Sequence, residues 1–67
     1  MDVKYEIQVG GQMFRVSSEK GEEHLRVLAG MVEHRMQEIA AAVRTVDSVR
    51  LALMTALTFA EELSEKD

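Results

Sequence analysis

The chain has 67 residues, a net charge of −4 and no cysteine. One small domain over residues 1–67 is therefore expected, with neither a disulfide nor a thiolate metal site to stabilise it. The acidic balance argues against nucleic-acid binding, and no apolar run approaches the roughly 18 residues that a membrane-spanning helix needs. The N-terminus also lacks the pattern of a signal peptide. We expect a cytoplasmic protein that gains stability by association with another chain.

The first element is a β-hairpin. Apolar and polar residues alternate strictly over about 3–9, as they do in a strand with one buried face. Gly10 and Gly11 follow, and a two-residue hairpin turn requires residues that tolerate positive φ. The return strand covers about 12–17. The register that this turn imposes pairs Tyr5 with Val16, Ile7 with Phe14, and Glu6 with Arg15.

The next element is an amphipathic helix over about 19–43. Its apolar residues recur at helical spacing from Leu25 to Val43. Ser18 is a candidate N-cap, because its side chain can accept hydrogen bonds from the first free amides. Gly30 lies inside this helix at a cost of about 1 kcal/mol relative to alanine. Another element could pack closely against Gly30, or the helix could simply tolerate the glycine; the sequence favours neither explanation.

A second helix is predicted over about 48–65, with Asp47 or Ser48 as its N-cap. The chain is thus an α+β protein of ββαα order, a β-hairpin followed by two α-helices. The second helix is apolar on two faces, and so small a chain cannot bury both, which predicts a homodimer. Helical angles assign one face to the dimer interface: Leu51, Met54, Leu57 and Thr58. They assign the other to packing within the chain: Leu53, Ala56, Phe59 and Ala60.

The second helix also carries the most specific motif. It contains the segment RLALMTALT, residues 50–58, with Glu62-Leu63 close behind. Together with the hairpin turn on glycine and the Gly21-Glu22-Glu23 entry to the first helix, this segment resembles the ZapA family over nearly the whole chain. Thr58 stands where the family pattern has asparagine.

The resemblance implies a bacterial cell-division accessory protein that acts at the division site. Members of the family dimerise through this head domain, and a coiled coil that continues the second helix pairs dimers into tetramers; these 67 residues do not include it. The family binds FtsZ and bundles or crosslinks its filaments. Basic positions implicated in that contact match Arg15 and Arg44, although Arg15 is also a cross-strand partner for Glu6.

Two alternatives remain beside this hypothesis. The chain could be a small structural or regulatory homodimer with another protein partner, or, more remotely, an acidic DNA-binding dimer. An enzyme is not expected, because no nucleophile, base and orienting group share a recognisable spacing. No cofactor or metal is expected either: His24 and His34 lie about 80° apart around a helix, too far for one compact site.

Overall fold

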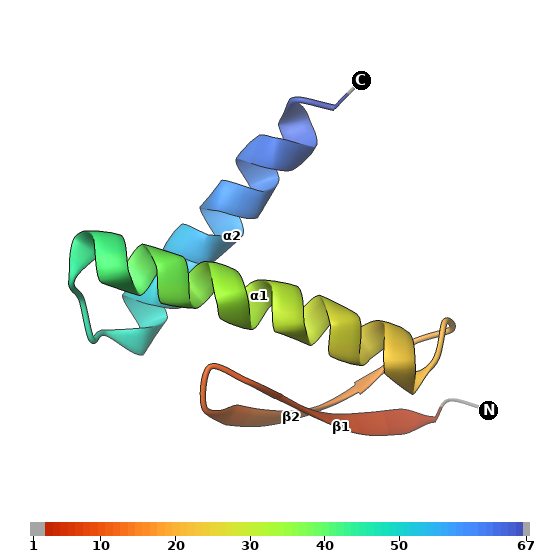
Figure 1. Ribbon diagram of the computed structural model, residues 1–67. Helices are drawn as coiled ribbons and strands as arrows, with labels where there is room; N and C mark the ends of the chain where they lie inside the picture. Colours follow the sequence, from red (N-terminus) through yellow and green to blue (C-terminus); the bar gives the residue numbers. More distant parts are fainter. Residues whose placement is uncertain (1–2, 67) are drawn as a thin grey trace. The chain divides into compact units, whose positions relative to one another are not determined.

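The structure is a computed structural model that describes residues 3–66. Its elements are β1 (Lys4–Val9), β2 (Gln12–Ser17), α1 (Glu22–Val43) and α2 (Ser48–Ser64), as Figure 1 shows. The predicted α+β fold, a hairpin followed by two helices, is confirmed. The first helix begins three residues later than predicted, at Glu22 and not at residue 19, and the other ends differ by one residue at most.

The hairpin has the predicted register. β1 and β2 pair antiparallel, with Ile7 opposite Phe14, Tyr5 opposite Val16, and Glu6 opposite Arg15. The turn has φ of 60° at Gly10 and 79° at Gly11. Two successive positive φ angles define the type I′ turn, whose twist matches that of the strands, and glycine adopts them without steric cost.

The start of α1 corrects one prediction. Ser18 does not cap the helix, because its hydroxyl accepts a hydrogen bond from the backbone N–H of Lys20 in the preceding turn. The helix begins after Gly21, which has φ of 91° and whose carbonyl accepts the bond from the N–H of Leu25. Glycine adopts this φ without steric cost, so the helix starts directly after Gly21. The Ser18 side chain instead stabilises the local turn that precedes it.

The start of α2 follows the prediction for Asp47. The Asp47 carboxylate accepts hydrogen bonds from the backbone N–H groups of Val49 at 3.0 Å and Arg50 at 3.2 Å. These amides have no partner inside the helix, so the cap satisfies two of its free donors. α1 ends just before Arg44, whose φ is 55°. A residue with a left-handed backbone conformation at this position directs the chain away from the helix axis.

The described residues fall into two units, one up to His34 and one from Arg35. The N-terminal unit contains the hairpin and the first part of α1, which run alongside each other in Figure 1. Its buried side chain is Ile7, 4% exposed. The C-terminal unit contains the end of α1 and all of α2, and its buried side chain is Thr55, 3% exposed. Within residues 3–66 these two are the only side chains classed as buried, so each unit has a very small core.

Candidate interaction surfaces

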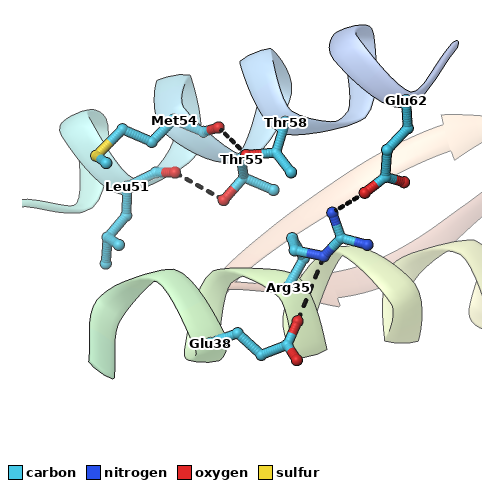
Figure 2. A network of polar contacts seen from close by, with 7 residues as sticks. All are labelled: Arg35, Glu38, Leu51, Met54, Thr55, Thr58 and Glu62. Carbon is cyan, nitrogen blue, oxygen red and sulfur yellow. Dashed lines mark hydrogen bonds and ion pairs between the residues drawn. The ribbon is translucent and has the colours of Figure 1, made fainter. Parts of the chain in front are cut away.

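One face of α2 is partly covered within the C-terminal unit. This inner α2 face consists of Leu51, Met54, Thr55, Thr58 and Phe59. Two threonines on it turn their hydroxyls back onto their own helix: Thr55 Oγ1 donates to the Leu51 carbonyl at 2.7 Å, and Thr58 Oγ1 donates to the Met54 carbonyl at 2.9 Å (Figure 2). The inner face therefore holds polar residues without an unsatisfied hydroxyl.

The opposite face of α2 is exposed. This outer α2 face consists of Val49, Leu53, Ala56, Leu57, Ala60 and Leu63. Helical geometry places them within an arc of about 120°. Leu53 is 62% exposed and Leu57 is 70% exposed. The prediction that Leu53, Ala56 and Ala60 pack within the chain is wrong, because helical angles give two apolar faces but not which of them a neighbour covers.

The four residues predicted for a dimer interface divide between the two faces. Leu57 lies on the outer α2 face, whereas Leu51, Met54 and Thr58 are half-buried on the inner face. The dimer interface itself stays a prediction. The structure thus places Leu53, which helical angles had assigned to packing within the chain, beside Leu57 on one exposed apolar face.

Arg35 is the centre of a charged cluster in the C-terminal unit. Its Nη1 bonds to Glu62 of α2, and its Nε lies 3.4 Å from Glu38 one turn along α1 (Figure 2). The guanidinium carbon lies 4.8 Å from the centre of the Phe59 ring, within the range of a cation–π contact. The hydrogen bond that Arg35 donates to the Glu62 carboxylate raises the pKa of Arg35 above its already high ordinary value.

Sequence reasoning missed this cluster. A usable signal was the i, i+3 spacing of Arg35 and Glu38 and the same spacing of Phe59 and Glu62. The first spacing places Arg35 and Glu38 on one face of α1, and the second places Phe59 and Glu62 on one face of α2. Arg35 joins them because a guanidinium is planar, so it binds a carboxylate through its edge and an aromatic ring through its face. The cluster links the end of α1 to α2.

The N-terminal unit has an open apolar groove of about 190 Å³ between the hairpin and α1. The residues that line it are all apolar: Ile7, Val9, Phe14, Val16, Leu25, Leu28, Ala29 and Val32. Phe14, Val16 and Leu28 are all exposed, as is every residue of β2. An apolar groove bordered by exposed large side chains is typical of a surface that another element covers.

The two basic candidates lie in different units. Arg15 is exposed on β2, and although it is opposite Glu6 in register, within residues 3–66 it forms no ion pair. Arg44 is exposed in the connection between the helices and likewise forms none in the described part of the chain. Their charges are thus not neutralised locally.

A metal site and a membrane-spanning helix were also considered for the described residues. Residues 3–66 contain no group of three histidine, cysteine or carboxylate side chains arranged to hold a metal ion. Across the same range, neither helix combines the length and the apolar character that crossing a bilayer demands. The outer α2 face and the groove are apolar, and exposed apolar surfaces of this kind suit contacts between proteins.

The comparison with protein families decides the relationship. The family model described as "Cell division protein ZapA" matches residues 5–67, which include the hairpin and both helices. The chain belongs to the ZapA family. A curated ZapA from Bacillus thuringiensis (strain Al Hakam) is 31% identical over 51 residues, covering 76% of this chain and 57% of the relative, and one from Bacillus anthracis gives the same values.

A ZapA from Shouchella clausii is 30% identical over 56 residues, which cover 84% of this chain and 72% of the relative. All three relatives are named "Cell division protein ZapA". The chain spans only about 57% of the length of the Bacillus relatives that it matches. No solved structure gives a significant match to the chain.

Proposed function

We propose that this ZapA-family chain is a non-enzymatic cell-division protein that forms a homodimer, binds FtsZ and promotes bundling or crosslinking of its filaments at the division septum, in the cytoplasm. The observation that carries the proposal is the family match over residues 5–67. FtsZ as the partner rests on the resemblance to the ZapA family. The homodimer has separate support from the burial of α2.

The small size of the core supports the proposed homodimer. Within residues 3–66, Ile7 is the only buried apolar side chain, while large apolar residues along α2 and β2 are exposed. Ordering a chain of this size costs on the order of 100 kcal/mol of conformational entropy, which burial must offset. A second copy that covers the outer α2 face removes its largest exposed side chains from water, at about 25 cal/mol for each Å² buried.

The apolar groove of the N-terminal unit fits the same dimer. A two-fold interface uses the same surfaces on both copies. If the outer α2 face of each copy lies in the groove of the other, both exposed apolar surfaces are covered in one symmetric step. The groove lining is wholly apolar, as the outer α2 face is, so no charge is buried without a partner.

A dimer also explains how a small protein can join filaments. Each copy carries one set of contact residues, for which Arg15 and Arg44 remain the candidates. Two linked sets bind a polymer with higher avidity than one, because the second contact forms at high effective concentration. A dimer whose two sets contact different filaments crosslinks them.

The first test is the mass in solution by analytical ultracentrifugation, followed by co-sedimentation with FtsZ polymers. We expect a dimer that pellets with the polymers and increases the light scattering of their suspension. The alternative is a structural or regulatory homodimer with another protein partner; a dimer that stays in the supernatant would favour it. A chain that remains monomeric at all concentrations would contradict the proposed mechanism.

The groove arrangement has a separate test. The chain has no cysteine, so single cysteines introduced at Phe14 in the groove and at Leu57 on the outer α2 face report on one contact. When Phe14→Cys and Leu57→Cys chains are mixed and oxidised, we expect disulfide formation mainly between unlike chains. Leu57→Cys mixed with Val27→Cys, which lies outside the groove, is the control. Equal crosslinking in both mixtures would contradict the arrangement.

A further inference from the structure

The hairpin has an open edge along β2. β2 pairs with β1 on one side, and within residues 3–66 no other strand pairs with it (Figure 1). All six residues of β2 are exposed. A strand edge of this kind presents a row of unpaired N–H and C=O groups, to which another strand can add. The edge of β2 is therefore a surface on which the sheet can be extended.

The register of the hairpin shows which main-chain groups point to this edge. In a hairpin closed by a two-residue turn, the residues that flank the turn exchange both of their hydrogen bonds, and such pairs alternate along the strands. Val9 and Gln12 flank the turn, so every second residue of β2 from Gln12 onward bonds to β1. The N–H and C=O groups of Met13 and Arg15, which lie between these residues, point to the open edge.

β2 lacks the features that usually protect an edge strand. It contains no proline and no lysine, its pairing with β1 has no bulge, and Arg15 is its only charged residue. β1, in contrast, carries Lys4 and Glu6. Met13 is 60% exposed and lies two residues from Arg15, so both side chains are on the same face of the hairpin. The edge of β2 can thus pair with a further strand.

We propose that β2 pairs with β2 of a second copy, antiparallel across a two-fold axis at Phe14, so that the two hairpins form one continuous sheet. In this register Met13 of each copy lies opposite Arg15 of the other, and the two residues exchange both of their main-chain hydrogen bonds. The apolar part of the arginine side chain lies along Met13 while its guanidinium stays in water. The neighbouring register, centred on Arg15, would oppose two guanidinium groups and is disfavoured. β2 is therefore complementary to itself.

This contact goes beyond the proposed function and is separate from the proposed dimer. It uses main-chain groups at the edge of β2, whereas the dimer covers the groove on one face of the hairpin. A two-fold axis perpendicular to the sheet keeps the grooves of both copies on the same face, where each can still receive a helix. A copy that makes both contacts has two neighbours, so the assembly grows beyond the dimer, as a closed assembly or an open chain.

The first test is amide hydrogen exchange, measured by NMR over a range of protein concentrations. We expect the amides of Met13 and Arg15 to exchange about fivefold or more slowly at high concentration, because they gain hydrogen bonds only when two copies pair. The amides of Gln12 and Phe14 already bond to β1 and are the internal controls, which should change less. Equal slowing of all these amides would show a general gain in stability and would overturn the edge contact.

Charges introduced at position 13 test the register. Because this position lies opposite Arg15 of the other copy, Met13→Glu should strengthen the association about twofold to tenfold, and Met13→Lys should weaken it by a similar factor. Sedimentation measures both in chains that also carry Leu57→Glu, which weakens the proposed dimer and leaves the edge as the main contact. Gln8→Glu and Gln8→Lys make the same charge changes on β1 and are the matched controls.

Met13→Pro tests the main-chain bonds directly. The N–H at position 13 does not bond to β1, so proline should leave the hairpin folded, while it removes a donor from the open edge. We expect Met13→Pro chains to form no species larger than the dimer, whereas Met13→Ala chains, which keep the amide, should form them as the unaltered chain does. Circular dichroism shows that both variants are folded, and the charge variants decide the matter if the proline variant is not.

Each contrary result has a distinct meaning. Equal association of Met13→Glu and Met13→Lys, or of folded Met13→Pro and Met13→Ala, would overturn the edge contact and leave the proposed function standing, since none of these experiments contains FtsZ. Slower exchange of the Met13 and Arg15 amides that appears only when FtsZ is added would assign the edge to a strand of that protein. That result would overturn a second copy as the occupant.

Discussion

The backbone N–H of Gly10, in the hairpin turn, donates a 2.8 Å hydrogen bond to Oε1 of Glu33, in the middle of α1. The two residues are separated by 23 positions in the sequence, and the bond is partly buried. A carboxylate that accepts from a backbone amide forms a charge-assisted bond, stronger than a neutral one. It therefore fixes the end of the hairpin onto the helix within the N-terminal unit.

Replacing Glu33 with alanine should loosen the hairpin. The partly buried Gly10 amide loses its acceptor, so we expect the free energy of unfolding to fall by about 1.5–3 kcal/mol, the usual contribution of a hydrogen bond to a charged group. Chemical denaturation at a fixed protein concentration measures it. Gln37→Ala, at an exposed position on the same helix, is the control and should change stability by less than about 0.5 kcal/mol. Equal losses in the two variants would contradict a specific role for Glu33.

Asp47→Ala should destabilise the start of α2. It removes the acceptor for the amides of Val49 and Arg50 and should cost about 1 kcal/mol. Asp47→Asn keeps a side-chain oxygen in the same place and should retain most of the stability. Thermal unfolding followed by circular dichroism compares the two. Equal melting temperatures for the asparagine and alanine variants would show that the cap contributes little.

Arg35 should stabilise the C-terminal unit through the shape of its side chain as well as its charge. Arg35→Lys keeps the charge but loses the planar group that bonds Glu62 and lies over Phe59. We expect melting temperatures to decrease from the unaltered chain to Arg35→Lys and again to Arg35→Met. A double-mutant cycle with Glu62→Gln should give a non-zero coupling. Strictly additive effects would show that the ion pair does not contribute.

The two faces of α2 should respond differently to a charge. Leu57→Glu alters the exposed outer α2 face and should weaken dimerisation, since the cost of the buried charge appears when the two copies associate. Met54→Glu alters the half-buried inner α2 face and should lower the stability of the subunit itself, by several kcal/mol. Ultracentrifugation combined with circular dichroism distinguishes the outcomes. A folded monomer from Met54→Glu and an unaffected dimer from Leu57→Glu would assign the interface to the inner face instead.

The β-hairpin shows what sequence patterns predict well. Strict alternation around Gly10-Gly11 leads to both the strands and their register, because a turn of known length leaves one pairing that keeps all apolar residues on one face. The cap of α2 was predictable to within one residue, as Asp47 or Ser48, and the structure shows that Asp47 accepts the two hydrogen bonds. The prediction that Ser18 caps α1 was wrong because its hydroxyl accepts a hydrogen bond in a local turn instead.

Surfaces formed by residues distant in sequence were harder to predict. The groove between the hairpin and α1 and the contact of Arg35 with Phe59 both join segments whose spacing in sequence says nothing of their contact. The exposure of Val46 was missed as well, because a valine in a short connection gives no periodic signal. Arg15 and Arg44 came from the family resemblance, and their role in binding stays a prediction.

The sequence by itself determined the order of elements, the register of the hairpin and the ZapA-family relationship, because each depends on local spacing or on a short motif. It narrowed the cap of α2 to Asp47 or Ser48. The tertiary structure alone decided that Leu53 and Leu57 are exposed while Met54 and Thr55 are not. Helical periodicity shows how many apolar faces a helix has. Which face is covered depends on the neighbour that packs against it, here the end of α1 through Arg35.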